Sequence, residues 1–239
     1  MKISVLVCTY NRKEKLLRTL RALRGQDYPA GELELLVLDD AGTDGSFEAA
    51  RAEAASFLAL GFRKAAALRS AANAGIAAGR ERLTREAAPD SDALLYLDDD
   101  VYLGGDTIGV LARRLEEDRA CVLAGPRLVY ASDRNRTAHC ANFVGPWTGR
   151  YTSEDASSDL RCDWLNSSCL LARRRAVPAG AWDGGDFYTG HEEVEFCLRL
   201  GRSGSVVYCP GASAAHDLDP AGGGRRDRLY YLYRNKLLV

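Results

Sequence analysis

Three consecutive carboxylates, Asp98, Asp99 and Asp100, directly follow an apolar run that ends at Leu97. Like charges this close raise one another's pKa, so the three cannot all ionise comfortably without a cation beside them. A hard divalent ion resolves the conflict, because Mg²⁺ and Mn²⁺ bind carboxylates and keep positions for phosphate oxygens. The segment therefore predicts a metal site, with a solvated acidic turn as the alternative.

A second acidic cluster lies at the start of a helix that we expect to begin near residue 192. Thr189 and Glu192 have the spacing of a capping box, and Glu195 lies four residues before Arg199, as in a surface ion pair. Glu193 is left without a local structural role. The helix dipole keeps a carboxylate in the first turn ionised, as a general base for a hydroxyl needs to be, whereas the alternative is a solvated glutamate.

The chain has three histidines, His139, His191 and His216. His216 follows residues 210–215, which predict a turn and a short strand, so it emerges at a strand end where a metal ligand fits. A hydrogen-bonded structural histidine is equally compatible with this position. Residues 191–195 lack the second histidine of the H-E-x-x-H pattern, which argues against a zinc metalloprotease.

The elements that must position these groups alternate between strands and helices in the first half of the chain. We expect strands at 3–8, 33–38, 62–68, 93–97 and near 121–123. We expect helices over 16–23, closed by Gly25, from after the turn at 42–45 to about 60, over 76–86, and from beyond 106 to about 117. This alternation is typical of β-α-β units around a mostly parallel sheet. Because acidic residues follow two strands, at Asp39-Asp40 and at Asp98, the two clusters are expected to face one crevice.

From residue 126 the sequence changes to short strands, aromatic residues and polar stretches. Residues 131–159 are too long for a simple connector and predict a long loop of functional importance. No internal repeat or interdomain linker is visible. We therefore expect one domain with two halves, 1–125 and 126–239.

The composition excludes several other classes of protein. The 239 residues are 46% hydrophobic and 27% charged, as in ordinary globular domains, and the net charge of −1 lacks the basic excess of proteins that coat nucleic acid. No apolar run approaches the roughly 18 to 20 residues of a membrane span, so neither a transmembrane helix nor a signal peptide is expected. Seven scattered cysteines without a C-x-x-C pair argue against a zinc knuckle or a disulfide scaffold and favour the cytoplasm.

Taken together, the motifs of the chain resemble those of glycosyltransferase family 2 in order and spacing along essentially the whole sequence. They are residues 4–12 (SVLVCTYNR), 38–40 (LDD), 73–75 (NAG), 98–100 (DDD), 191–195 (HEEVE) and 230–235 (YYLYRN). Residues 163–168 and 210–216 make the rhamnosyltransferase-like and galactofuranosyltransferase-like branches the most similar. The resemblance implies a GT-A fold, a nucleotide-diphosphate sugar donor, a divalent metal and inversion at the anomeric carbon.

The resemblance also implies roles for single residues. It places a nucleotide and sugar pocket at Thr9, Tyr10, Arg12, Asp40, Asn73, Gly75, Asp98 and Asp99. Asp40 is expected to bond the pyrimidine edge, as for a UDP-sugar or dTDP-sugar. Asp100 and His216 are the expected ligands of Mn²⁺ or Mg²⁺, and Glu193 takes the position of the catalytic base, where many relatives have aspartate.

Aromatic residues of the second half are expected to bind the acceptor, a saccharide or a lipid-linked sugar. Among Trp147, Trp164, Trp182 and Tyr188, we assign Trp164 and Trp182 to the acceptor site together with Glu192, although large aromatic residues also fill protein cores. The tail from Arg225 predicts a basic amphipathic helix after a glycine hinge at 222–224. It would act as a lid over the diphosphate, as a peripheral contact with an anionic membrane, or as a packed terminal helix.

Two rival functions remain for such a chain. A binding or scaffold protein with the same fold would have lost at least one of Asp100, Glu193 and His216, and all three are present. A nucleotidyltransferase would need a glycine- and lysine-rich triphosphate loop near the first strand, and residues 9–15 have no glycine. The sequence leaves the donor sugar, the acceptor and the oligomeric state open.

Overall fold

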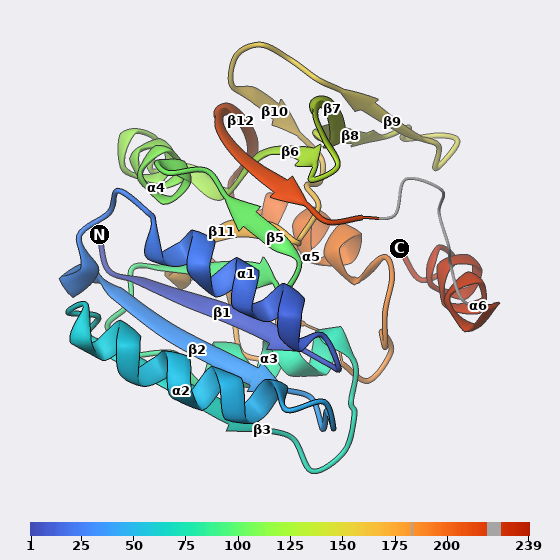
Figure 1. Ribbon diagram of the computed structural model, residues 1–239. Coiled ribbons are helices and arrows are strands. Elements are labelled where there is room, and N and C mark those ends of the chain that lie inside the picture. Colours follow the sequence, from blue (N-terminus) through green and yellow to red (C-terminus); the bar gives the residue numbers. More distant parts are fainter. Residues whose placement is uncertain (183, 219–225) are drawn as a thin grey trace.

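The structure, a computed structural model, describes residues 1–182, 184–218 and 226–239. Its first half alternates strands and helices, as the sequence predicts (Figure 1). The elements are β1 (Ile3–Thr9), α1 (Lys13–Arg24), a 3₁₀ turn (Ala30–Glu32), β2 (Leu33–Asp39), α2 (Ser46–Ala59), β3 (Lys64–Arg69), α3 (Ile76–Glu86), β4 (Ala93–Asp98), β5 (Val101–Leu103), α4 (Thr107–Glu117) and β6 (Cys121–Tyr130).

The second half contains more regular structure than the sequence predicts. Its elements are β7 (Asp133–His139), β8 (Ala141–Val144), β9 (Tyr151–Glu154), β10 (Leu160–Cys162), β11 (Cys169–Arg173), a 3₁₀ turn (Arg174–Ala176), α5 (Glu192–Gly201), β12 (Ser205–His216) and α6 (Arg226–Asn235). The prediction of a long loop over 131–159 was therefore wrong, because this segment folds into three strands. The turn expected at 210–215 lies within β12 as an irregularity of register between Cys209 and Ser213.

Within the described residues, ten strands form one mixed sheet with the order β10-β12-β6-β11-β4-β1-β2-β3, in which β5 pairs with β12 and β7 with β6. In the first half of the chain, β1 pairs in parallel with β2 and with β4, and β2 pairs in parallel with β3. β11 runs antiparallel between β4 and β6, and β6 pairs in parallel with β12. The sheet thus continues from the first half of the chain into the second. β6 contains residue 125, the last residue of the first of the two halves that the sequence predicts.

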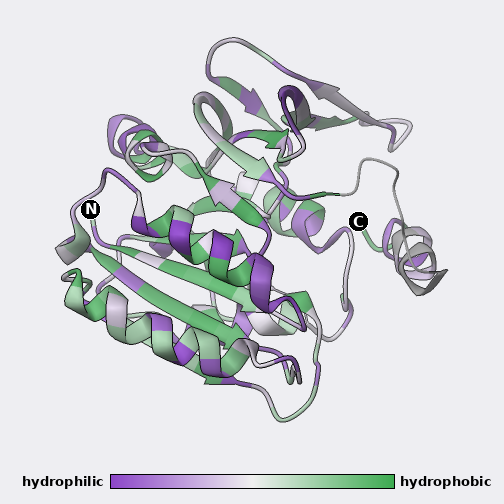
Figure 2. Cartoon of the chain, viewed as in Figure 1, coloured by the Kyte–Doolittle hydropathy of each residue, from purple (hydrophilic) through white to green (hydrophobic). Residues whose placement is uncertain are grey.

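Helices cover both faces of this sheet, so that an apolar core lies on each side of it. One core packs Leu16 and Leu20 of α1, Phe57 of α2 and Leu111 of α4 against the strands. The other packs Leu83 of α3 and the buried side of α5. In Figure 2 β1 and β2 are largely hydrophobic, whereas α1 and α2 alternate between hydrophobic and hydrophilic residues, as expected of helices with one face on the sheet. This is the layered α/β architecture that the sequence predicts.

The topology brings the chemically interesting strand ends to one edge. Thr9 of β1 pairs with Asp39 of β2, and Cys8 pairs with Asp98 of β4, so the three strands end side by side. At the end of β12, His216 pairs with Val101, the residue that follows Asp100. The clusters near residues 40 and 98 thus share one edge of the sheet, as predicted.

The described helices do not include one that is both long and apolar enough to cross a membrane.

Candidate functional site

Asp100 and His216 meet although 116 residues separate them in the sequence. Nε2 of His216 lies 3.2 Å from Oδ1 of Asp100, and the Oγ of Ser168 lies 3.4 Å from Nδ1 of the same ring. Asp98 completes a group in which one ligand atom from each of Asp98, Asp100 and His216 lies within 4.8 Å of the others. Two carboxylates and an imidazole are a donor set that holds a divalent cation.

Basic side chains partly neutralise this acidic edge. Nη1 of Arg12 lies 3.2 Å from Asp99 and 3.0 Å from Asp100, and Nζ of Lys15 lies 3.6 Å from Asp100. Burial disfavours the charged form of Asp100, but the hydrogen bond and charge of His216, with Arg12 and Lys15, outweigh it and lower the pKa of Asp100. Asp100 is therefore ionised and available as a ligand at neutral pH.

Asp99 is buried, as Asp100 is, but it does not belong to the candidate metal group. It accepts a hydrogen bond of 2.7 Å from Thr9, and its carbonyl oxygen accepts one of 2.8 Å from Thr19. Burial is the main cause that raises its pKa to about 6. Asp99, which the sequence analysis assigned to the nucleotide pocket together with Thr9, thus connects the end of β1 and the middle of α1 to the acidic turn, and it also contacts Arg12.

Asp40 follows the end of β2 and contacts the turn before α3. Its Oδ2 accepts the backbone N–H groups of Ala74 and Gly75, each at 3.0 Å. Its Oδ1 is buried and has no hydrogen-bond partner among the described residues. A buried acceptor without a partner is costly, so this oxygen is well suited to accept a hydrogen bond from a bound ligand.

Tyr188 contacts the same turn. Its hydroxyl donates a hydrogen bond of 2.7 Å to Asn73, and its carbonyl oxygen accepts the N–H of Ile76 at 3.2 Å. Gly75 has φ +85°, and a Cβ there would lie 2.5 Å from the Tyr188 carbonyl oxygen. Only glycine therefore fits at residue 75. The sequence analysis also assigned Tyr10 to the nucleotide pocket. Tyr10 directly follows β1, and its side chain is exposed.

Arg80 is a central residue of the site that sequence reasoning missed. It is buried in α3, where Nη2 lies 2.8 Å from Asp98 and Nη1 lies 3.4 Å from Glu192. Nη1 also donates a hydrogen bond of 2.7 Å to the Oγ of Ser167, and the guanidinium lies 4.8 Å from the ring centre of Trp182. The signal in the sequence was an arginine on the apolar face of α3, three residues before Leu83. Arg80 links the acidic turn to the start of α5.

The first turn of α5 contains Glu192 and Glu193, as predicted. The predicted capping box was wrong: the N-cap is His191, with φ +66°, and among the described residues no side chain caps this helix. The predicted ion pair between Glu195 and Arg199 is confirmed, at 2.6 Å. α5 is therefore fixed by contacts other than a local cap.

Glu192 and Glu193 differ in their surroundings. Glu192 is buried against Arg80, and burial, followed by the charge of Glu193, raises the pKa of Glu192 to about 7. Glu193 is half-buried and close enough to Tyr151 for its charge to add to burial in raising the pKa of that phenol. Of the two carboxylates, Glu193 is therefore the one that lies beside the aromatic residues of the second half.

Those aromatic residues form a cluster next to α5. The ring centre of Tyr151 lies 5.5 Å from that of Trp164 and 5.7 Å from that of His191. Trp164 is half-buried, so part of its surface remains open to a ligand. Trp147, at the tip between β8 and β9, is 95% exposed.

Trp182 and Glu192 do not lie where the sequence-based assignment put them. Trp182 is 1% exposed and stacks on Phe196 with ring centres 3.9 Å apart, while Glu192 is 7% exposed and faces Arg80. The structure thus corrects the assignment of these two residues to the acceptor site. The competing interpretation of the tryptophan, that a large aromatic side chain fills the core, is the one that applies to Trp182.

The predicted C-terminal helix is present as α6, to the right of the sheet in Figure 1. It packs against the segment before α5 through Asn235, which is fully buried, while Tyr230 and Tyr233 are exposed. The glycine hinge expected at 222–224 lies outside the described residues.

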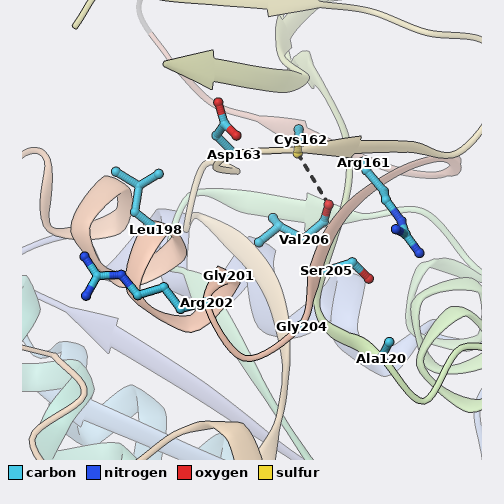
Figure 3. Close-up of a pocket in the computed structure, with 10 residues that line it drawn as sticks. All are labelled: Ala120, Arg161, Cys162, Asp163, Leu198, Gly201, Arg202, Gly204, Ser205 and Val206. Carbon is cyan, nitrogen blue, oxygen red and sulfur yellow. Dashed lines mark hydrogen bonds between the residues drawn. The ribbon is translucent and has the colours of Figure 1, made fainter. Parts of the chain in front are cut away.

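A cavity of about 530 Å³ lies away from this site, between β10, α5 and the start of β12 (Figure 3). It contains none of the candidate site residues. Arg161 and Arg202 line it but extend to opposite sides in Figure 3, so the two charges do not converge on one position. The cavity is therefore not part of the candidate site.

The chain matches the model of the family described as Glycosyl transferase family 2 over residues 4–177. It is 28% identical over 126 residues to the poly(ribitol-phosphate) β-N-acetylglucosaminyltransferase TarS of Staphylococcus aureus strain Mu50, a match of 52% of this chain and 20% of that protein. It is 38% identical over 74 residues to the N-acetylglucosaminyl-diphospho-decaprenol L-rhamnosyltransferase of Mycobacterium tuberculosis strain H37Rv, which covers 30% of this chain and 24% of that protein. The matches thus span only a fifth to a quarter of these relatives.

Among solved structures, GalNAc-T7 with UDP, GalNAc and Mn²⁺ superposes with a TM-score of 0.72 at 15% identity, covering 94% of this chain and 45% of that one. This likeness confirms the predicted GT-A fold. Since the family model covers well over half of the residues, from β1 to the end of the second 3₁₀ turn, the chain belongs to glycosyl transferase family 2.

Proposed function

We propose that the protein is an inverting glycosyltransferase that moves a sugar from a nucleotide-diphosphate donor to a hydroxyl of a glycan or a lipid-linked acceptor. The observation that carries the proposal is the bridge formed by Arg80. Through this one guanidinium, Asp98 at the acidic turn and Glu192, the neighbour of Glu193, belong to one buried network. Donor and acceptor chemistry would thus take place on one rigid unit.

The nucleotide would bind between the ends of β1 and β2. The buried Oδ1 of Asp40 is an acceptor suited to an N–H of a pyrimidine, as in a UDP- or dTDP-sugar. Asn73 and Gly75 border this position, and Tyr188 holds Asn73 in place. The tight packing at Gly75 keeps the pocket preformed, which lowers the entropic cost of binding.

The residues at the acidic edge fit a divalent metal. Asp98, Asp100 and His216 would hold Mn²⁺ or Mg²⁺, because their ligand atoms already lie close together. Bound there, the ion would supply positive charge to the departing diphosphate. Arg12 and Lys15 lie beside Asp100 and would add their own charge to the same group.

Glu193 is the residue that we assign as general base. It would take the proton of the acceptor hydroxyl as the oxygen attacks the anomeric carbon and the bond to the diphosphate breaks on the opposite side. The partial positive charge at the N-terminus of α5 favours its ionised form. Protonation of Glu192 would relieve the repulsion between the two neighbouring carboxyl groups.

Calorimetric titration tests the donor site. UDP, dTDP and GDP are titrated, each with and without Mn²⁺, into the wild type and into Asp100→Asn. Asp27→Asn is the control, because Asp27 is exposed and its position in the sequence is not near the strand ends that carry the candidate site. The proposal predicts metal-dependent binding of one nucleotide, which Asp100→Asn abolishes and Asp27→Asn retains. Failure of the wild type to bind any of the three would favour a binding protein without transferase activity.

A second experiment tests the base. With the nucleotide class known, a panel of the corresponding sugar donors is screened for transfer, and Glu193→Gln is compared with the wild type. The variant should bind nucleotide normally and lose transfer by about 10² to 10⁴-fold, the usual contribution of a general base. Wild-type turnover in Glu193→Gln would refute the assignment.

A further inference from the structure

Asn235, near the end of α6, is a fully buried amide that contacts the segment before α5. Its Nδ2 donates one hydrogen bond of 3.0 Å to the carbonyl oxygen of Thr189 and another of 2.6 Å to that of Gly190. A primary amide has two N–H donors, and both are used here on consecutive carbonyl groups of one turn. The Oδ1 accepts a hydrogen bond of 3.0 Å from Arg234.

The turn that Asn235 contacts has an unusual backbone. Gly190 has φ +82° and His191 has φ +66°, so two successive residues are left-handed immediately before α5 begins at Glu192. A residue with a side chain adopts this conformation only when its surroundings hold it there. Because no described side chain caps α5, the direction in which this helix starts depends on the turn.

Arg234 of α6 and Lys236, the residue that follows the helix, contact the same part of the structure. Arg234 donates a hydrogen bond to the carbonyl oxygen of Asp186, and Nζ of Lys236 lies 5.1 Å from the ring centre of Tyr151. Tyr151 in turn lies against His191, with its hydroxyl 3.4 Å from Nδ1. The last residue of α6 therefore holds the turn directly, through the carbonyl groups of Thr189 and Gly190, and Lys236 contacts the Tyr151 ring that lies beside His191.

We propose that Asn235 is a positioning residue for the catalytic base: by binding the carbonyl groups of Thr189 and Gly190, it holds the left-handed turn that aims Glu193. This inference rests on the proposed function of Glu193. Asn235 touches no reacting group, so its effect must pass through the turn and α5. A displacement of the base by about 1 Å is enough to slow a transfer step by up to ~10²-fold.

The first experiment measures local stability and is independent of any activity. Hydrogen exchange of the full chain is followed in the wild type, in Asn235→Ala and in the control Tyr233→Ala, which removes a side chain of the same helix that is 76% exposed. Amides of residues 189–196 should exchange about tenfold faster or more in Asn235→Ala, whereas Tyr233→Ala should match the wild type. Unchanged exchange in Asn235→Ala would overturn the inference.

The second experiment separates positioning from a general structural role. Asn235→Ala should lower kcat by about 10 to 100-fold and leave the nucleotide Kd within about threefold of the wild type. Asn235→Asp, which keeps the shape but replaces the donating amide by a carboxylate, should behave similarly. If both variants fail to fold, or if Kd and kcat change in parallel, Asn235 is a structural residue and the inference is wrong.

A double mutant tests whether Asn235 acts through Glu193. In the Glu193→Gln background, Asn235→Ala should reduce the remaining transfer by less than about threefold, since a base that is absent cannot be misplaced. A full additive loss would overturn the inference while leaving the proposed function intact. Wild-type transfer in Glu193→Gln alone would instead refute the proposed function, and the exchange experiment would still report on the turn.

Discussion

The guanidinium of Arg80 donates a hydrogen bond of 2.8 Å to the carboxylate of Asp98, from α3 to the end of β4. Arg80 is almost completely buried, so this bond is shielded from solvent on the side of the arginine. The same side chain reaches Glu192, which otherwise would be a buried carboxyl group without a cation beside it. The integrity of the whole site therefore depends on a residue that need not touch either substrate.

Arg80→Met should destabilise the fold by about 3 to 5 kcal/mol, because removal of one partner leaves the others as uncompensated buried polar groups. The free energy of unfolding is measured by chemical denaturation. Arg85→Met, in the same helix, is the matched control: Arg85 is 68% exposed and forms only a surface pair with Glu81, so its loss should cost less than about 0.5 kcal/mol. Equal effects of the two substitutions would contradict the central role of Arg80.

Glu192 should make the stability of the protein depend on pH. Burial and the charge of Glu193 raise its pKa from 4.5 to about 7 in the folded state, so the folded protein binds this proton more tightly than the unfolded chain. The stabilisation of the folded state by the tighter binding of this proton is complete below pH 4.5, and it is lost as the pH rises through about 7. Across this window the contribution is on the order of 3 kcal/mol.

Glu192→Gln removes this titration and should flatten the loss of stability between pH 4.5 and 7, whereas Glu86→Gln, at an exposed position, should leave the profile unchanged. The free energy of unfolding is measured across that range for the three proteins. Identical slopes in the wild type and Glu192→Gln would show that Glu192 is not the titrating group.

Trp164 is the aromatic residue that we expect to bind the acceptor, because it is half-buried next to Tyr151 and close to the first turn of α5. Trp164→Ala should raise the acceptor KM by about tenfold, or about 1.4 kcal/mol, because the acceptor would lose the apolar surface of the ring that it covers. The nucleotide Kd should not change. Trp147→Ala, which removes a ring that is 95% exposed, is the control. A loss of nucleotide affinity in Trp164→Ala would place this residue in the structural core instead.

Gly75→Ala should damage the nucleotide site that we propose. The new Cβ would lie 2.5 Å from the Tyr188 carbonyl oxygen at a backbone φ of +85°, so both contact and conformation are unfavourable. We expect a loss of stability of at least about 1 kcal/mol together with weaker nucleotide binding. Gly31→Ala, where nothing lies within 4 Å of the added methyl group, should change neither quantity. Normal nucleotide affinity in Gly75→Ala would separate this turn from the pocket.

Two features could be predicted from the amino-acid sequence: the alternating strands and helices of the first half, and the common edge of the sheet at which β2 and β4 end near Asp40 and Asp98. Both follow from local signals, since apolar periodicity defines each element and parallel strands place their carboxyl ends together. The sequence also placed Glu193 in the first turn of a helix. The second half was harder to predict, because its short polar strands, such as β7, are stabilised by pairing partners rather than by their own pattern.

Which polar and aromatic side chains face the candidate site depends on long-range packing. Glu192 and Trp182 are residue types that suit an acceptor site, yet both side chains pack inward against Arg80. Arg80 lies 112 residues before Glu192 in the chain. Asn235 reaches Thr189 across 46 residues. Contacts over such separations depend on how helices and sheet pack in three dimensions, because short-range patterns fix the face of an element but not what that face meets.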